Sequence, residues 1–474
     1  MGIRSGSEFR ESIRDGRTIY VDGQRVDDVT SYRPFEGIIE TLASLYDVQK
    51  ERPNELTYRS PTTGDPVAMS FLVGETDEEV ERRRHAEEIR CEMTFGLMGR
   101  MPDFMNALVT DAAAFMETPS RHGRRYTDNL ARYYLDCREN DWCLTHTLVD
   151  PQIDRSKGPA GQIDPALALH RVRETDRGLI VRGARMLSTL APFANELFVG
   201  PFYPRGVGDE AYALCFAIPM NTPGLKFICR ESYDKGRSRF DRPLSGRFDE
   251  EDALAVFDDV CVPWERVFID GDIAASNDFI SKVPGYALLQ CIIRGMVKLK
   301  FLTGLACYLA EAVGRSEAVH VQAQLGELVA NVEILTGLVR AAVSEVAAAR
   351  RERRAVRTLA AALWVFCPQS QMRAAEVIRQ VAGSGLIMTP TEKDFANSEI
   401  AGFIEQYFQG KGVDARRRVQ LFKLAWDMIG EQFGSRQLQY EWFYAGDPYF
   451  TRSRFYKSPV VAEYKALVDR LLGT

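Results

Sequence analysis

Two long stretches toward the C-terminal end constrain the fold more than any other part of the sequence. Residues 285–314 and 325–352 carry apolar side chains at positions i, i+3, i+4 and i+7. This spacing predicts long helices with apolar stripes, which are buried when the helices pack against one another. The C-terminal part of the chain is therefore expected to be a bundle of long helices.

The region before these helices contains seven short β-rich runs between residues 144 and 263. Turn residues separate the runs, as at Asp176-Arg177-Gly178 and Pro223-Gly224. Short strands with such turns predict a compact antiparallel barrel or sandwich.

The N-terminal part has a mostly helical texture from residue 35 to residue 132, with a capping box at Thr76–Glu79. A short helix over residues 5–15 and a hairpin at Asp22-Gly23 precede it. Because 474 residues are too many for one simple core, we expect several packed units. The predicted domains are residues 1–140 (mostly helical), 141–278 (β-domain) and 279–474 (helical bundle and tail).

The composition excludes some classes of partner. The formal net charge of −6 argues against a broad nucleic-acid-binding face, and no apolar run reaches membrane-spanning length. The nine cysteines are scattered without a CxxC pair, which is typical of buried thiols in a reducing compartment. The N-terminus has no secretory signal, so we expect a cytoplasmic protein with no nucleic-acid or membrane partner.

Three stretches resemble the acyl-CoA dehydrogenase superfamily. VFDDVCVPWERVF (256–268) is similar to the strand and turn that end its β-domain, and RGARMLSTLAPFANE (182–196) to the strand beside the isoalloxazine ring. RQVAGSGLI (379–387) resembles the glycine-bearing segment that approaches the flavin pyrophosphate from a neighbouring subunit. The resemblance implies an α+β fold with an N-terminal helical domain, a central β-barrel or sandwich and a C-terminal four-helix bundle.

Three further stretches narrow the resemblance: FGLMGRMPDFMNA (95–107), LTHTLVDPQIDR (144–155) and KLAWDMIGEQFGSRQLQYEWFYAGDP (423–448). Together they resemble the 4-hydroxyphenylacetate 3-hydroxylase family, the oxygenase component of two-component flavin monooxygenases. This implies FAD, used as FADH2 from a separate NAD(P)H:flavin reductase, with molecular oxygen as co-substrate. It also implies ortho-hydroxylation of a phenol through a flavin C4a-hydroperoxide, and a homotetramer built as a dimer of dimers.

The resemblance assigns catalytic roles to His146 and Arg100. The matching family histidine hydrogen-bonds the phenolic hydroxyl and helps to generate a phenolate-like ring, and imidazole is the side chain most easily tuned for proton transfer near neutral pH. The matching arginine lies near that hydroxyl, where a fixed cation stabilises developing negative charge. The alternatives are a core histidine bonded to a carbonyl and an arginine that caps a helix C-terminus.

The substrate-binding candidates are Phe104 and Arg205. The family's best-known hydroxylases have a tyrosine at position 104, and phenylalanine keeps the ring but loses the hydrogen-bonding group. This argues against 4-hydroxyphenylacetate itself and leaves open another phenol, a carrier-tethered substrate, an N-containing substrate or an apolar wall with unchanged chemistry. Arg205 lies in the glycine-containing loop 203–210, which closes over the substrate in relatives, and could meet a substrate carboxylate.

The cofactor-binding candidates are hydroxyl and amide side chains on strand edges and small residues after a helix. Each alone is more often an ordinary strand or loop residue, and only the resemblance gives them weight. They are Thr147, Gln152, Arg155, Ser188, Thr189, Gln380, Gly383 and Gly385.

Two other enzyme classes share the superfamily. An acyl-CoA dehydrogenase needs a glutamate base, for which Glu441 and Glu376 are candidates in unconvincing contexts. A 4-hydroxybutyryl-CoA dehydratase needs an iron–sulfur cluster, but Cys91 and Cys291 lack partners in the sequence, so no metal site is expected. A non-enzymatic helical scaffold would leave the motifs around Arg100 and His146 unexplained.

Overall fold

The computed structural model describes residues 2–115, 124–151, 153–282, 285–352, 356–444 and 446–473. They form two compact units, the first from Met1–Val297 with Ala341–Val356 and the second from Lys298–Arg340 with Arg357–Thr474. Within the described ranges, no helix is long and apolar enough to cross a membrane.

The first unit begins with local elements that the sequence predicts well. Ser5 caps the first helix in a capping box with Glu8, and Thr76 caps the fourth in the same way with Glu79. The helices of this unit, in chain order, are α1 (Gly6–Ser12), α2 (Glu36–Glu51), α3 (Pro53–Leu56), α4 (Asp77–Met93), α5 (Pro102–Phe115), α6 (Arg125–Asn140), α7 (Ser245–Phe248) and α8 (Ile273–Lys282).

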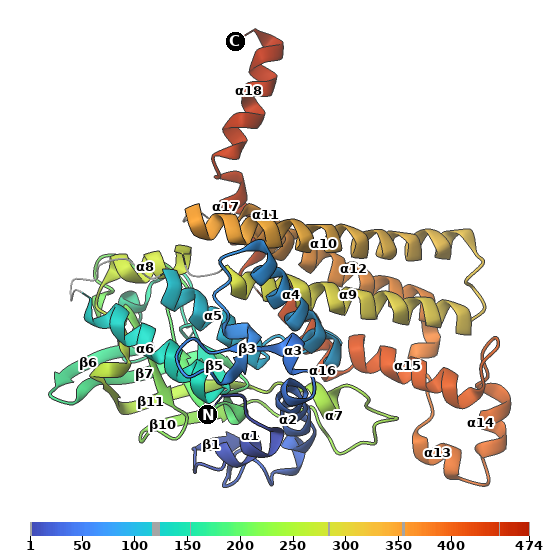
Figure 1. Cartoon of the computed structure of the whole chain (residues 1–474). Helices are drawn as coiled ribbons and strands as arrows, with labels where there is room; N and C mark the ends of the chain where they lie inside the picture. Colours follow the sequence, from blue (N-terminus) through green and yellow to red (C-terminus); the bar gives the residue numbers. More distant parts are fainter. Residues whose placement is uncertain are drawn as a thin grey trace. The chain divides into compact units, whose positions relative to one another are not determined.

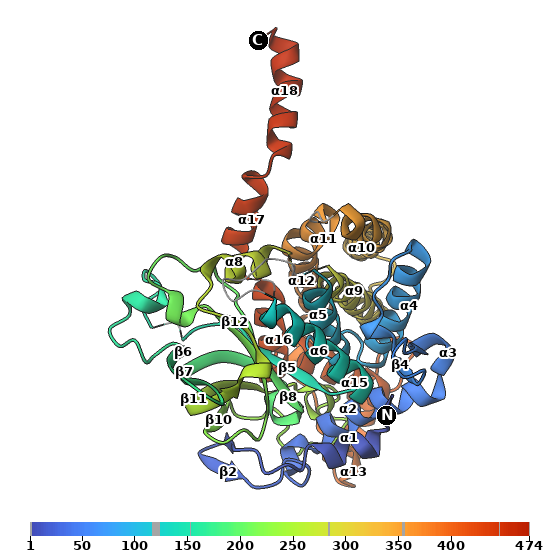
Figure 2. The same ribbon diagram turned by 60° about the vertical axis from the view of Figure 1, so that its left-hand side comes forward.

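The strands of the first unit form two larger sheets and one small hairpin (Figures 1 and 2). One sheet has the order β2-β1-β10-β11-β7-β6 and the other the order β12-β9-β8-β5, while β3 pairs only with β4. The strands are β1 (Ile19–Val21), β2 (Gln24–Val26), β3 (Thr57–Arg59), β4 (Pro66–Ala68), β5 (Leu144–Thr147), β6 (His170–Thr175), β7 (Gly178–Thr189), β8 (Glu196–Val199), β9 (Leu214–Pro219), β10 (Leu225–Cys229), β11 (Asp252–Pro263) and β12 (Val267–Asp270).

Aromatic and aliphatic side chains fill the space where the two larger sheets meet. Phe216 of β9 meets Phe257 of β11 edge to face, with ring centroids 6.0 Å apart. Phe198 of β8 stacks on Phe268 of β12 within the second sheet at 5.9 Å. Burying such rings on facing sheets gives the sandwich its core.

The sheet pairing departs from a purely antiparallel sandwich in two places. β1 runs parallel to β10, with Ile19 opposite Phe227, and β5 runs parallel to β8, with His146 opposite Phe198. The N-terminal hairpin at Asp22-Gly23 therefore forms as predicted but joins the central sheet. These parallel pairs join strands that are not linked by a hairpin, so turn residues gave no signal for them.

The second unit is helical. Helices α9 (Tyr286–Ala312) and α10 (Val319–Glu352) confirm the predicted long helices, and each contributes residues to both units. The remaining helices are α11 (Arg357–Ala361), α12 (Cys367–Ala382), α13 (Glu392–Ala396), α14 (Ala401–Tyr407), α15 (Ala415–Ile429), α16 (Gln432–Phe443), α17 (Pro448–Tyr456) and α18 (Val460–Leu472). Both views show α18 extending away from the other helices of this unit (Figures 1 and 2).

Candidate functional site

His146 lies in β5, a short strand whose four residues are all buried. The strand pairs with β8, and its histidine side chain is only 6 % exposed. The predicted strand context of His146 is therefore correct. A buried imidazole at this position must find hydrogen-bond partners inside the protein or on a ligand.

Arg100 is brought to His146 by a break between two helices. Phe95 and Gly96 have positive φ values of 53° and 67° after α4 ends, and α5 begins at Pro102, as the sequence predicts. The guanidinium Nε of Arg100 donates to Nε2 of His146 at 2.7 Å. The two residues that the resemblance assigns to catalysis thus lie in direct contact.

The hydrogen bond from Arg100 decides the protonation of His146. A guanidinium can only donate, so Nε2 of the imidazole is the acceptor and the neutral ring carries its proton on Nδ1. Burial, and then the positive charge of Arg100, hold the pKa of His146 well below its usual value of 6.5. His146 is therefore a neutral imidazole near neutral pH.

Nδ1 of His146 is buried and has no hydrogen-bond partner among the described residues. A buried N–H group without a partner is costly in a folded protein. The position is accordingly suited to a ligand oxygen, to which His146 would donate.

Phe104 completes a compact group with these two residues. Its ring lies under the guanidinium of Arg100, 4.2 Å from Cζ to the ring centroid. The ring also meets His146 edge to face, with centroids 5.8 Å apart, and is 7 % exposed. Phenylalanine therefore contributes an apolar wall beside the two polar groups.

Arg205 belongs to a buried ion cluster. Its Nη1 lies 2.7 Å from Oδ2 of Asp150, and Nη1 of Arg185 lies 3.0 Å from Oδ1 of the same carboxylate. The two arginines lower the pKa of Asp150, although burial opposes them, and burial lowers the pKa of Arg185 to about 10. One carboxylate for two guanidinium groups gives this cluster, Asp150–Arg185–Arg205, an excess positive charge.

The cluster is held in place from two sides. The backbone N–H of Arg205 donates to Oδ1 of Asn277 at 2.8 Å, and Nδ2 of Asn277 donates to the carbonyl of Arg205 at 3.1 Å. Nη1 of Arg185 donates to the carbonyl of Leu148 at 2.9 Å. The loop that carries Arg205 is thus fixed to α8 by a reciprocal pair of hydrogen bonds.

Three of the predicted cofactor residues lie close to β5. Thr147 donates from its hydroxyl to the carbonyl of Met186 in β7 at 3.3 Å, and Thr189 donates to Oδ1 of Asp252 at 2.7 Å. The hydroxyl of Ser188 is buried without a hydrogen-bond partner among the described residues. A residue with positive φ, Leu187 at 62°, precedes Ser188 where the β7–β11 register shifts.

The other predicted cofactor residues lie elsewhere in the chain. Arg155 is exposed on the loop after β5, and Gln152 lies outside the described residues. Gln380, Gly383 and Gly385 belong to the second unit.

The glycines of the second unit have stereochemical reasons to be glycine. Gly383 has φ of 61° and ψ of −149° at the end of α12, a conformation that side chains disfavour. A Cβ at Gly385 would come within 2.5 Å of the ring of Phe422. Gln380 is exposed and donates to Glu376 at 2.9 Å. None of these contacts requires a flavin, so their predicted role stays a prediction.

The residues near β5 fit a flavin in their chemistry. The polar edge of an isoalloxazine ring presents hydrogen-bonding nitrogen and oxygen atoms, which short hydroxyl side chains on strand edges can meet. Ser188 provides such a hydroxyl, which is buried and has no partner in the described part of the chain. Thr189, the next residue of β7, and Thr147 of β5 are also buried.

The glutamates considered for acyl-CoA dehydrogenase chemistry are engaged in ion pairs. Within the second unit, Glu441 accepts from the buried Lys298 ammonium at 2.8 Å. Glu376 pairs with Arg373 at 2.8 Å on the exposed side of α12. Both carboxylates are therefore occupied by a cation of the same unit, which disfavours this alternative.

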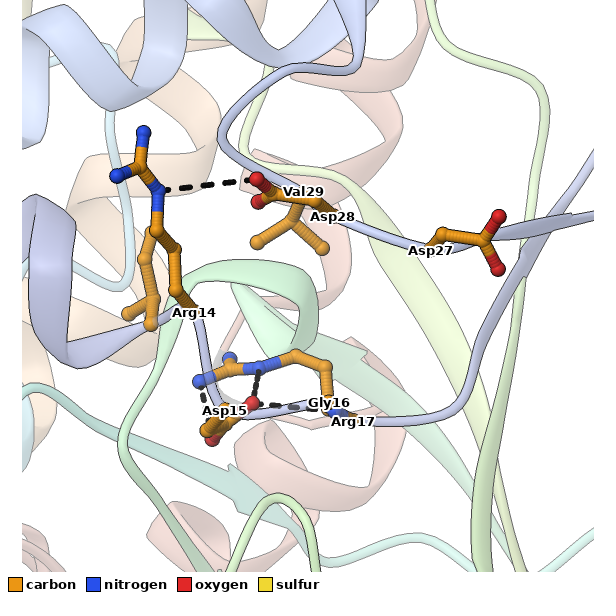
Figure 3. Close-up of a pocket in the computed structure, with 8 residues that line it drawn as sticks. Arg14, Asp15, Gly16, Arg17, Asp27, Asp28 and Val29 are labelled. Carbon is orange, nitrogen blue, oxygen red and sulfur yellow. Dashed lines mark hydrogen bonds and ion pairs between the residues drawn. The ribbon is translucent and has the colours of Figure 1, made fainter.

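A shallow pocket of about 200 Å³ lies at the base of the N-terminal hairpin (Figure 3). Four of its charged groups pair with one another, because Arg17 bonds Asp15 at 2.7 Å and Arg14 lies 3.7 Å from Asp28. None of the predicted site residues lines it, so it is separate from the Arg100–His146 group.

Four residues at the site were missed in the sequence. Glu250 accepts a hydrogen bond from the backbone N–H of Arg100 at 2.6 Å, and Asp150, Arg185 and Asn277 build the cluster around Arg205. Asp150 and Arg185 lie within stretches that carry the family resemblance, and this was the available signal. Glu250 and Asn277 come from distant segments, for which the sequence gives no signal.

Comparison with known proteins places the chain in a family. The sequence model described as 4-hydroxyphenylacetate 3-hydroxylase N terminal matches residues 5–269, and the one described as 4-hydroxyphenylacetate 3-hydroxylase C terminal matches residues 276–473. Together these matches span nearly the whole sequence.

Curated relatives align over almost their full lengths. The chain is 37% identical to the 4-hydroxyphenylacetate 3-monooxygenase oxygenase component of Geobacillus sp. (strain PA-9), covering 100% of this chain and 97% of that protein. It is 35% identical to the oxygenase component of 4-nitrophenol 2-monooxygenase from Rhodococcus sp., covering 94% of this chain and 86% of the relative.

Solved structures agree with the sequence comparison. The oxygenase component of 4-hydroxyphenylacetate 3-monooxygenase, in complex with FAD and 4-hydroxyphenylacetate, superposes with a TM-score of 0.92 at 35% identity, covering 99% of this chain and 98% of that one. An archaeal 4-hydroxybutyryl-CoA dehydratase (TM-score 0.86, 22% identity) and a glutaryl-CoA dehydrogenase (TM-score 0.55, 12% identity) share the fold alone. The predicted acyl-CoA dehydrogenase-like α+β fold is confirmed, and the chain belongs to the 4-hydroxyphenylacetate 3-hydroxylase family.

Proposed function

We propose that this chain is the oxygenase component of a two-component monooxygenase that uses FADH2 and molecular oxygen to hydroxylate a phenol ortho to its hydroxyl group. One observation carries the assignment to this site. Arg100 donates to Nε2 of His146 and leaves a buried N–H at Nδ1 that has no partner among the described residues. A ligand oxygen at this position would satisfy that donor beside a permanent positive charge.

The protein residues bind and orient the phenol. His146 donates to the phenolic oxygen, and Arg100 favours negative charge on that oxygen and on the ring. Phe104 provides an apolar face beside the two donors, against which an aromatic ring can pack. Fixing the ring in one orientation favours oxidation at a single carbon.

Ser188, Thr147 and Thr189 would hold the flavin from the β-domain. When bound in its reduced form, the flavin reacts with molecular oxygen and supplies the oxygen atom that the phenol receives. The side chains around His146 are buried, so water is kept away from the reacting groups.

Phe104 broadens the choice of substrate. The relatives named above act on 4-hydroxyphenylacetate and on 4-nitrophenol, according to their names, so the family takes phenols with different para substituents. Without a tyrosine hydroxyl at position 104, this site has one group fewer to recognise a phenol. The excess positive charge of the Asp150–Arg185–Arg205 cluster suits a substrate with an anionic substituent, including a carboxylate.

Three further points belong to the proposal. A separate NAD(P)H:flavin reductase supplies the reduced flavin, as the name "oxygenase component" of the relatives suggests. The assembly is a homotetramer. The protein acts in the cytoplasm, a reducing compartment that suits nine scattered cysteines.

The test is an isotope experiment with the purified protein. FADH2 is added anaerobically, followed by labelled oxygen (18O2) and a panel of para-substituted phenols, and the products are identified by mass spectrometry. We expect a catechol with a single 18O atom. Hydrogen peroxide as the only product from every phenol would contradict the proposal. Incorporation of 18O on nitrogen or into a carrier-bound substrate would instead indicate a member of the family with that kind of substrate.

A further inference from the structure

The hydroxyl of Thr189, at the end of β7, uses its hydrogen in a contact with the protein. Oγ1 of Thr189 donates to Oδ1 of Asp252, the first residue of β11, at 2.7 Å, and the threonine is only 3 % exposed. A carboxylate without a proton can only accept hydrogen bonds, so the single hydrogen of the threonine is committed to this contact. Thr189 therefore presents only its lone pairs to a bound ligand.

Asp252 is held in position by a cation and by the sheet. Nε of Arg230 donates to Oδ2 of Asp252 at 3.1 Å, and this positive charge favours the ionised form of the carboxylate. The backbone of Asp252 pairs with that of Thr189 across the two antiparallel strands. Asp252 is therefore a fixed acceptor for the threonine hydroxyl.

The three hydroxyl groups proposed for the flavin differ in this respect. The hydroxyl of Thr147 also donates to the protein, at 3.3 Å to the carbonyl of Met186, whereas that of Ser188 has no partner among the described residues. Ser188 can therefore turn its hydroxyl to donate or to accept. The backbone of Thr189 is fixed in addition by the hydroxyl of Thr145, which donates to its carbonyl.

The oxidation state of a flavin changes the hydrogen bonds that its ring can make. N5 of the oxidised ring is an acceptor, and N5 of the reduced ring carries a hydrogen and is a donor. N3 carries a hydrogen in both states. A hydroxyl that can only accept would therefore favour the reduced ring if it meets N5, and would not distinguish the two states if it meets N3.

We propose that Asp252 is a positioning residue, which fixes the hydroxyl of Thr189 as an acceptor for the N5–H of the reduced flavin and so makes the site bind the reduced form in preference to the oxidised form. The inference rests on the proposed function, in which Thr189 holds the flavin. Asp252 acts through Thr189. If its negative charge acted on the flavin directly, the effect would have the opposite sign, because a nearby anion disfavours added electrons.

The experiment measures the affinities of the protein for FAD and FADH2 without oxygen and without a phenol, together with the midpoint potential of the bound flavin. Thr189→Val keeps the shape of the side chain and removes the hydroxyl. We expect the Kd for FADH2 to rise by about three- to tenfold and the Kd for FAD to change by less than about twofold. This lowers the midpoint potential by about 15–30 mV, since tenfold in affinity equals about 30 mV for two electrons.

Asp252→Asn tests the positioning role. The amide of asparagine can donate to the threonine oxygen, which frees the hydroxyl hydrogen, so the midpoint potential should fall as it does in Thr189→Val. In the double variant, Asp252→Asn should add nothing to the effect of Thr189→Val. The ion pairs of Arg230 with Asp249 and Glu251 remain in Asp252→Asn, so the guanidinium keeps partners.

Two further variants are controls. Thr189→Ser keeps the hydroxyl and should retain the midpoint potential of the wild-type protein, which separates the hydrogen bond from packing. Asp258→Asn changes an exposed carboxylate of the same strand, which pairs with Lys226 at 2.9 Å, and the potential should not move.

The outcomes distinguish the inference from the function on which it rests. If Thr189→Val weakens FAD and FADH2 equally, the hydroxyl does not select the oxidation state and the inference is wrong. If Asp252→Asn raises the potential, or still shifts it in the Thr189→Val background, Asp252 does not act through Thr189. If the wild-type protein binds neither FAD nor FADH2, the proposed function itself is refuted.

Discussion

The Nε atom of Arg100 donates a hydrogen bond of 2.7 Å to Nε2 of His146, and this single bond leaves Nδ1 as the imidazole nitrogen that can meet a ligand. The family resemblance gives His146 a part in generating a phenolate-like ring. In the structure its Nε2 lone pair is bound by a cation and its Nδ1–H is without a partner among the described residues. Under the proposed function, His146 would therefore act as a hydrogen-bond donor to the phenolic oxygen.

Replacing Arg100 should reduce catalysis strongly without preventing folding. Arg100→Gln keeps part of the side chain's length and some of its hydrogen-bond donors but removes the positive charge. We expect kcat/KM to fall by about 10²- to 10³-fold, the usual range for loss of an electrostatic stabiliser. The measurement is catechol formation with FADH2 supplied in excess, and Arg182→Gln serves as the control. A decrease in kcat/KM of less than about threefold would show that Arg100 is not a catalytic residue.

His146 should make the protein less stable at acidic pH. Its pKa in the folded state is well below 6.5, so below about pH 6.5 the unfolded chain binds a proton that the folded chain does not. The free energy of unfolding should therefore fall as the pH decreases through this range, by up to about 1.4 kcal/mol per pH unit from this group. Denaturant unfolding at a series of pH values measures this pH dependence of the free energy of unfolding.

The variant His146→Gln should lose this part of the pH dependence. His85→Gln is the comparison, since His85 is exposed and meets Glu55 at 3.2 Å on the surface. Equal slopes for the wild-type protein and His146→Gln between about pH 5 and pH 6.5 would show that His146 is not held neutral.

The buried carboxylate of Asp150 should be important for stability. Asp150→Asn leaves Arg185 and Arg205 buried without an anion, and breaking a buried pair from one side costs about 3–5 kcal/mol. The exposed pair between Asp259 and Arg182 is the matched control, and Asp259→Asn should cost less than about 1 kcal/mol. Adding Arg205→Met to Asp150→Asn should recover part of the loss, and equal costs for the two single Asp→Asn variants would contradict the cluster's role.

Arg205 should affect substrates according to their charge. Arg205→Gln removes positive charge from the cluster, so KM for 4-hydroxyphenylacetate should rise by about tenfold, as for one lost charge-assisted hydrogen bond. KM for 4-nitrophenol, which has no carboxylate, should change by less than about twofold. Equal changes for both substrates would mean that Arg205 supports only the fold of the loop.

Ser188 should matter for flavin and not for the flavin-free protein. Its buried hydroxyl has no partner in the described ranges, so Ser188→Ala should leave the stability of the flavin-free protein unchanged or slightly higher. The Kd for FAD should rise by about two- to tenfold, as for one neutral hydrogen bond. The control is Ser276→Ala in α8, another buried serine whose hydroxyl lacks a partner among the described residues. An unchanged Kd in Ser188→Ala would remove this residue from the cofactor site.

Local signals in the sequence predicted the local structure well. The capping box at Thr76, the turn at Asp22-Gly23 and the break around Pro102 each depend on residues that are close in the chain, and each appears in the structure. The strands β3, β4 and β12 are too short to show the alternation of apolar and polar residues that predicts a strand. The three-domain division stays a prediction.

Long-range contacts at the site could not be derived from the sequence in the same way. The prediction that Arg100 and His146 belong to one site came from the family resemblance, because no spacing pattern links two positions so far apart in the sequence. The ion pair between Asp150 and Arg205 depends on how a loop folds back onto the end of β5, which local propensity does not encode. The proton on Nδ1 of His146 depends on that three-dimensional contact with Arg100, so the sequence favoured the role of a base.

The most direct test of the central claim is the fate of oxygen in a single turnover of the protein with FADH2 and 4-nitrophenol. Catechol and hydrogen peroxide are quantified together, for the wild-type protein, Arg100→Gln and His146→Leu. We expect the wild-type protein to form mostly catechol, whereas both variants should release mostly peroxide because the phenol is no longer held. Equal catechol yields from all three proteins would show that Arg100 and His146 do not form the phenol site.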